Sequence, residues 1–120
     1  GTFVVPPDYV TTPNFKAYWS ADNNVITGKA KLGVSYRTLV DDDSMDKATA
    51  QESVNVAAGT TTSGTADGMN VTTIGAPTAG NFAAGDMVEY RVERLGSDTT
   101  NDTMAAKLVL HDLVFEYADA

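Results

Sequence analysis

The stretch that decides the fold class is residues 86–95, which read DMVEYRVERL. Apolar and charged side chains alternate along it, with Val88, Tyr90 and Val92 set against Glu89, Arg91 and Glu93. Successive side chains of a strand point to opposite faces, so this period of two places the apolar groups on one side. In a helix the same groups would be scattered around the axis. The stretch therefore predicts a half-buried antiparallel strand.

The same period appears in two other stretches. Residues 14–21 place Phe15, Ala17 and Trp19 on one face, and residues 29–40 place Ala30, Leu32, Val34, Tyr36 and Val40 on one face. Four less regular runs, at residues 2–5, 51–57, 69–74 and 107–117, are also expected to be strands. From these phases we expect one core that contains Trp19, Leu32, Val34, Tyr36, Val88, Tyr90 and Val92.

The segments between these runs contain turn-forming residues. Residues 22–24, 57–68 and 75–85 are predicted loops, and one helical turn is expected at residues 44–50. The pattern predicts an all-β, antiparallel β-sandwich with jelly-roll-like wiring, seven to eight strands and at most one short helical turn. Residues 1–120 are expected to form a single domain. Seven strands fit either a seven-stranded sandwich or a jelly roll whose first strand precedes Gly1.

Charge and composition exclude several function classes. The chain has 8 basic and 16 acidic residues, a net charge of −8 and no cysteine. Nucleic acid binding needs clustered Lys and Arg, and anionic membranes attract the same residues, so neither partner is expected. Without cysteine there is neither a disulfide framework nor a thiolate metal site. No cofactor is predicted.

The last predicted strand, at residues 107–117, is apolar on both faces. If it is regular, Leu108, Leu110 and Val114 face outward, and we predict that they form an interface with a partner surface. This predicts a homo-oligomer, since identical chains that meet through one patch form closed assemblies. The alternative is a bulge near His111 and Asp112, which would turn the apolar groups inward.

Two acidic segments are candidate sites. Calcium prefers carboxylate oxygens, and Asp41, Asp42, Asp43 and Asp46 are the weak candidate metal ligands. Their spacing does not fit an EF-hand, so a capped turn is the favoured interpretation and no metal is predicted. The second segment, residues 98–103, is expected to be a structural loop whose side chains bond their own backbone.

No catalytic constellation is evident, and we do not expect an enzyme. His111 is the only histidine, and no nucleophile motif accompanies it. A pair of carboxylates for glycoside hydrolysis would need a cleft lined by aromatic rings. Trp19 is in phase with the core, whereas Tyr18 points the other way and is the better candidate for an exposed sugar platform.

Three stretches together resemble a known group of proteins. They are residues 4–9 with 15–21 (VVPPDY and FKAYWSA), residues 32–37 leading to 41–46 (LGVSYR and DDDSMD), and residues 84–94 (AGDMVEYRVER) with Asp98, Asn101, Asp102, Thr103 and a closing strand. This pattern is similar to that of small tailed-phage virion proteins with a jelly-roll domain, of the head-decoration and fibre-like kind. The resemblance implies a structural role on the particle, and it implies no catalytic residues.

The leading hypothesis is an accessory structural protein of a phage virion, which decorates or cements a capsid or forms part of a fibre. Its expected partners are copies of itself, with a trimer favoured by the resemblance, and other virion proteins such as the major capsid protein. It would be assembled in the host cytoplasm and reside in the virion. The alternative is a carbohydrate-binding β-sandwich module for host surface glycans. Several exposed aromatic rings in one groove would favour that alternative.

Overall fold

The computed structural model describes residues 1–22, 27–41, 43–45, 50–55, 60–61, 65 and 68–119. The strands form two main sheets and one small ladder. The first sheet has the order β1 (Thr2–Val4), β8 (Met87–Arg94), β4 (Leu32–Leu39) and β5 (Glu52–Asn55). The second has the order β7 (Asn70–Gly75), β2 (Thr11–Ala21) and β9 (Leu108–Ala118). The ladder joins β3 (Lys29–Ala30) to β6 (Thr60–Thr61).

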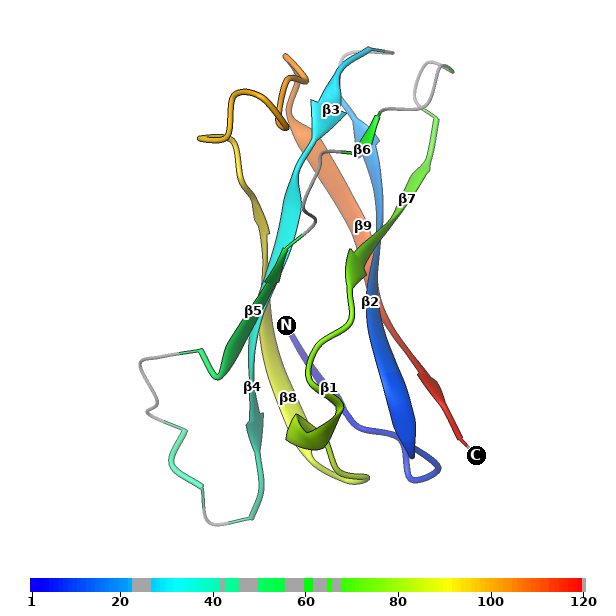
Figure 1. Cartoon of the computed structure of the whole chain (residues 1–120), viewed down its shortest axis with the longest axis vertical. Coiled ribbons are helices and arrows are strands. Elements are labelled where there is room, and N and C mark those ends of the chain that lie inside the picture. Colours follow the sequence, from blue (N-terminus) through cyan, green and yellow to red (C-terminus); the bar gives the residue numbers. More distant parts are fainter. Residues whose placement is uncertain are drawn as a thin grey trace.

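The two main sheets pack face to face, with the strands along the long axis of the molecule (Figure 1). Every pairing is antiparallel. The chain passes directly from one main sheet to the other between β1 and β2, between β7 and β8, and between β8 and β9. It also crosses through the small ladder, by way of β3 between β2 and β4 and by way of β6 between β5 and β7. The helical structure in the described residues is one 3-10 turn at Ala79–Asn81. The prediction of an all-β antiparallel sandwich is therefore confirmed.

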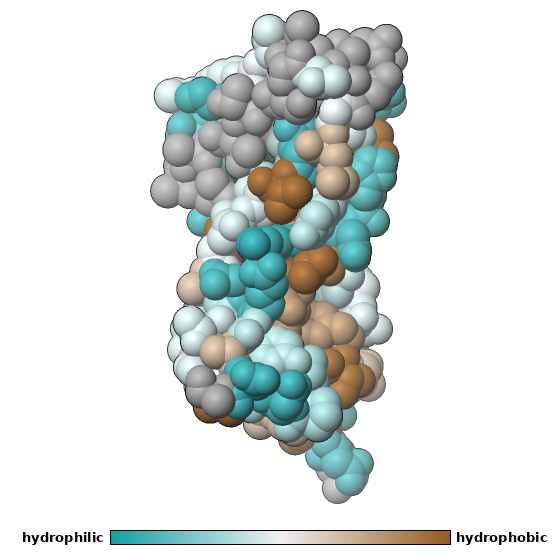
Figure 2. Space-filling model, turned by 90° about the vertical axis from the view of Figure 1, so that its right-hand side faces the viewer, coloured by the Kyte–Doolittle hydropathy of each residue, from teal (hydrophilic) through white to brown (hydrophobic). Residues whose placement is uncertain are grey.

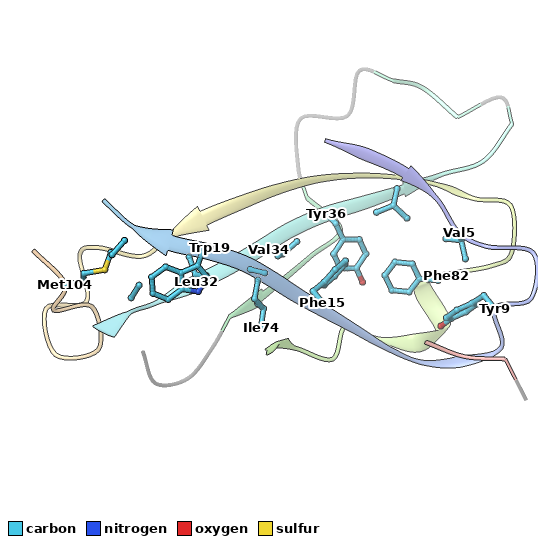
Figure 3. Close-up of a cluster of buried hydrophobic side chains, with 14 of the residues drawn as sticks. Val5, Tyr9, Phe15, Trp19, Leu32, Val34, Tyr36, Ile74, Phe82 and Met104 are labelled. Carbon is cyan, nitrogen blue, oxygen red and sulfur yellow. The ribbon is translucent and has the colours of Figure 1, made fainter. Parts of the chain in front are cut away.

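The core is a row of side chains between the two layers. It runs from Met104 at one end, past Trp19 and Tyr36, to Val5 and Tyr9 at the other (Figure 3). Five of the seven predicted core residues are buried, namely Trp19, Leu32, Val34, Tyr36 and Val88. Tyr90 and Val92 are half-buried and pack against this cluster, because β1 covers only the first residues of β8.

One predicted phase is wrong at the end of β4. Val40 was expected in the core, but it is 56% exposed, whereas Leu39 is buried. The N–H of Val40 donates to Oδ2 of Asp43 at 3.0 Å, so the strand ends at Leu39 and Val40 already belongs to a turn. Alternation cannot be extended past a residue whose backbone bonds a turn side chain.

The connections agree only partly with the predicted loops. The segment at 75–85, expected to be irregular, contains the 3-10 turn, and β6 lies within the segment expected to be the 57–68 loop. Most of the helical turn expected at 44–50 lies outside the described residues.

Candidate functional site

In the part of the chain that the structure describes, an open groove lies between β1 and β9. It has a volume of about 390 Å³, and the residues that line it include Thr2, Phe3, Val4, Tyr90, Leu113 and Phe115. The two sheets come together at this side, since β1 is the edge of one and β9 the edge of the other. The groove is therefore the seam of the sandwich.

Three aromatic rings meet in this groove. The centroid of Phe3 lies 5.0 Å from that of Phe115 and 6.0 Å from that of Tyr90, and all three side chains are half-buried. Aromatic rings offer apolar faces to a sugar or to another side chain, and such contacts prefer offset or tilted geometry. Because the rings contact one another, they together form an apolar floor of the groove on which a ligand could lie.

The predicted interface residues of β9 do not lie on one face. Across the β2–β9 pairing, Tyr18 lies opposite Asp112 and Trp19 opposite Leu110, so His111 is an extra residue in β9. The alternative of a bulge at this point is confirmed. Leu110 shares the core-side face with Trp19, and Leu108 shares it with Ala21.

The assumption of a shared outward face for Leu108, Leu110 and Val114 is therefore wrong, because the bulge inverts the phase of β9 halfway along it. Only Val114, opposite Lys16, faces outward. Leu108 and Leu110 face the seam, where Leu108 packs against the core and Leu110 remains 41% exposed. An interface that involves these residues stays a prediction.

The outer face of the second sheet carries apolar groups interspersed with polar ones. Val71 and Val109 are exposed there, at 47% and 43%, among the cross-strand partners of Tyr18 and Ser20. Figure 2 shows brown side chains separated by teal and pale ones over much of this side of the molecule. Tyr18 is half-buried between Val71 and Asp112, so it offers less platform than expected.

The structure brings His111 close to a hydroxyl that sequence reasoning missed. Nε2 of His111 lies 2.9 Å from Oγ of Ser20, and the contact is exposed on the outer face. A serine beside a histidine is half of a nucleophilic site, and catalysis also needs oxyanion donors around the reacting carbonyl. The pair forms a cross-strand contact at the bulge.

The candidate metal ligands are only partly described. Asp42 and Asp46 lie outside the described residues, Asp41 is exposed, and Asp43 accepts the hydrogen bond from Val40. The described part of the chain holds no group of three or more His, Asp or Glu side chains arranged for a metal ion. This bond closes the turn from Val40 to Asp43 and is not a helix cap, which would accept from residues after Asp43, so the capped-turn interpretation stays a prediction.

The acidic segment 98–103 forms an ion-paired loop at one end of the sandwich. The guanidinium of Arg94 donates to both carboxylate oxygens of Asp102, and Nζ of Lys31 donates to Asp98 at 2.8 Å. The bond from Lys31, joined by those from Asn101, lowers the pKa of the Asp98 carboxyl, and the bonds from Arg94 lower the pKa of the Asp102 carboxyl. These carboxylates are engaged within the protein, which supports the structural interpretation of the loop.

The aromatic groove is the feature that sequence reasoning missed. Phe3, Tyr90 and Phe115 come from three strands far apart in the sequence, and only the strand order of the two sheets brings them together. Each of these residues lies on the apolar face of its strand, which the sequence does show. Their contact depends on which strands are neighbours and on where β1 stops pairing with β8, and no single stretch of sequence reveals either.

Comparisons with known proteins identify no relative. No family model, no curated protein and no solved structure matches the chain. Among the described residues there is no helix with the length and apolar character to span a membrane.

Proposed function

We propose that the chain is an accessory structural protein of a bacteriophage virion, which acts by protein–protein assembly in a capsid or fibre. The observation that carries the assembly part is β9, an edge strand of 11 residues with apolar side chains on both faces. Natural proteins protect long edge strands or use them for pairing. The virion part rests on a resemblance to phage virion proteins. The residues that carry it are 4–9 with 15–21, 32–37 with 41–46, and 84–94 with Asp98, 101–103 and the closing strand at 108–117.

The proposed partners are further copies of the chain and other virion proteins such as the major capsid protein. Val109 and Leu110 are among the more exposed large apolar residues, and both lie on β9. The acidic charge of −8 favours contact with neutral or basic protein surfaces over nucleic acid or anionic lipid. No catalytic role is proposed.

Mass spectrometry of particles purified from the phage that encodes the chain tests this proposal. A structural protein is expected in purified particles at a fixed ratio to the major capsid protein, and that ratio is expected to persist through density-gradient banding. If the chain is recovered only from the soluble lysate, the virion role fails.

A second candidate function, carbohydrate binding, is favoured by the three rings in the groove. Sugars stack on aromatic rings, and an apolar floor with polar neighbours is typical of small-ligand sites. NMR titration with neutral and acidic oligosaccharides would locate such a site by shifts at Phe3, Tyr90 and Phe115. The variant Tyr90→Leu is expected to abolish those shifts, and Tyr18→Leu, on the outer face of β2, is the matched control.

A further inference from the structure

One edge of β9 is bonded to β2, and no strand of the described chain pairs with its other edge. The carbonyl of Lys107 accepts from the N–H of Asp22, and the carbonyl of Ala118 accepts from the N–H of Val10, so both point toward the β2 side. Backbone groups of alternate residues point to alternate edges, and the bulge at His111 shifts that alternation by one. The residues whose backbone N–H and C=O groups point to the free edge are therefore Leu108, Leu110, Leu113, Phe115 and Tyr117.

The side chains of β9 divide in the same way, into one set that faces the core and one that faces outward. Those opposite buried residues of β2 face the core side, namely Leu108, Leu110, Leu113 and Phe115. Those opposite Ser20, Tyr18, Lys16 and Asn14 face outward, namely Val109, Asp112, Val114 and Glu116. Lys107 continues the outward series before Val109.

We propose that two copies of the chain pair antiparallel through the free edges of β9, about a two-fold axis that passes between His111 and Asp112. In this register Leu110 lies opposite Leu113 of the second copy, and Leu108 lies opposite Phe115. On the outer face, Val109 lies opposite Val114, and Lys107 lies opposite Glu116. The proposal rests on the assembly function proposed above and specifies its self-contact.

The bulge makes this register specific. With the axis between His111 and Asp112, residues whose backbone points to the free edge lie opposite each other, and core-facing side chains meet core-facing ones. A shift by one residue places core-facing side chains opposite outward-facing ones. A shift by two keeps most faces matched, but at the centre it places a core-facing leucine opposite Asp112 or His111, and it separates Lys107 from Glu116. Cross-strand charge also agrees, because Lys107 of each copy meets Glu116 of the other, which Lys16 of its own chain already contacts at 3.1 Å.

The contact would cover the part of β9 that the isolated chain leaves open. Leu110 is 41% exposed and Val109 is 43% exposed, on opposite faces of the strand. Leu110 of one copy would lie beside Leu113 of the other, which lines the groove between β1 and β9. The two three-stranded sheets would become one continuous sheet, the arrangement in which edge strands of identical chains satisfy each other.

Engineered cysteines test the register directly, because the chain contains none of its own. Opposed residues in a non-hydrogen-bonded pair have Cβ atoms about 4.5–5.5 Å apart, within reach of a disulfide after small adjustment. Within one chain, positions 109 and 114 are about 15 Å apart along the strand and cannot be bridged. The double variant Val109→Cys/Val114→Cys is therefore expected to give a covalent dimer under mild oxidation, whereas each single variant is expected to remain monomeric on a non-reducing gel.

Charge exchange tests the same pairing without covalent chemistry. Lys107→Glu alone places two acids opposite each other, and Glu116→Lys alone places two lysines opposite each other. Each is expected to weaken dimerisation at least tenfold by analytical ultracentrifugation, and the double exchange is expected to restore most of it. Arg91→Glu, on β8, changes the net charge by the same amount as Lys107→Glu and is the matched control for that variant. Circular dichroism of every variant separates lost pairing from lost folding.

Each result decides between pairing and its alternatives. A monomer by light scattering at tens of micromolar, a dimer that the double cysteine variant does not link, or a trimer would overturn the β9 contact. Any of these results, with the chain present in purified particles, removes the contact and leaves the virion role in place. A linked dimer that is absent from particles removes the virion role and leaves the contact.

Discussion

Strands β2 and β9 are both 11 residues long and pair with each other over nearly their whole length, yet they behave differently. From Pro13 to Ala21 every second residue of β2 is buried without a break. No residue of β9 is fully buried, and Leu110 on its core-side face stays 41% exposed. The first strand is central, between β7 and β9, whereas the second is an edge strand with a bulge.

The difference between the two strands shows when alternation of apolar and polar residues correctly predicts which side chains face the core. Alternation assigns faces correctly only while no extra residue enters the strand. In β2 the shift against β9 between Thr11 and Asn14 precedes the alternation of Phe15, Ala17 and Trp19. At the shift between Phe15 and Lys16 the extra residue, Ile74, belongs to β7, so the alternation of β2 is not interrupted. In β9 the shift lies in the middle, so one pattern becomes two opposite ones.

Single-residue deletions at facing positions are expected to give the largest contrast. Deleting Tyr18 from β2 moves Trp19 to the outer face and inverts one half of the strand, so we expect no cooperative unfolding transition. Deleting His111 removes the bulge and makes the β2–β9 pairing regular. Its effect on the free energy of unfolding is expected to stay within about 1 kcal/mol.

Urea denaturation followed by tryptophan fluorescence measures both deletions. A folded protein without Tyr18 would mean that β2 can slip along its neighbours. A protein without His111 that fails to fold would mean that the bulge itself holds the fold together.

Truncation of core-side residues is the next largest test. Trp19 is fully buried, and its Nε1 donates to Oγ1 of Thr72 at 2.9 Å. Trp19→Ala is expected to lower the free energy of unfolding by about 3–5 kcal/mol. Leu110→Ala, on the paired residue of β9, is expected to cost only about 1 kcal/mol because the side chain is already partly exposed. Equal losses at the two positions would contradict the difference between the strands.

The sequence predicts the layers of the fold better than the site. Apolar residues alternate regularly in the sequence of β8 and in the Leu32–Tyr36 part of β4, and this pattern alone places Val34 and Val88 in the core. The prediction for Val40 is wrong because the hydrogen bond from Val40 to the side chain of Asp43 ends the strand, and hydropathy does not record such a bond. The groove was not predicted for another reason. The contact between Phe3 and Phe115 joins the edges of two sheets, and strand order is a property of the whole chain.

The start of β9 depends on an ion pair, which gives a third prediction. Arg94 donates to Asp102 and also to the carbonyls of Met104 and Ala106, just before β9 begins. The side chain of Asp102 is 4% exposed and that of Arg94 is 24% exposed. Asp102→Ala leaves the guanidinium with its carbonyl partners but without its carboxylate. It is expected to cost about 2–3 kcal/mol, below the usual range for breaking a fully buried pair because Arg94 is partly solvated.

The same pair predicts a dependence on pH. Hydrogen bonds from Arg94 lower the pKa of the Asp102 carboxyl below its ordinary value. Its stabilising contribution is therefore present above the unfolded-state pKa of about 3.9 and is lost as the pH falls through the lower folded-state value. Denaturation at pH 7 and pH 3 measures it. Asp102→Ala is expected to lose less stability over that interval than the unaltered chain, and an equal loss in both would assign the acid sensitivity to other carboxyls.

The smallest expected effect concerns the bond that crosses the bulge. Oγ of Ser20 and Nε2 of His111 are 2.9 Å apart on the exposed outer face, where water can replace either partner. Ser20→Ala and His111→Ala are each expected to change the free energy of unfolding by no more than about 0.5 kcal/mol, and the double variant by the sum. A coupling above about 1 kcal/mol in this double-mutant cycle would mean that the side-chain bond fixes the bulge. Additive effects would instead mean that the backbone pairing of β9 with β2 fixes the bulge. Leu110 and Leu113 lie on either side of it, and both can face the core only if the strand contains one extra residue between them.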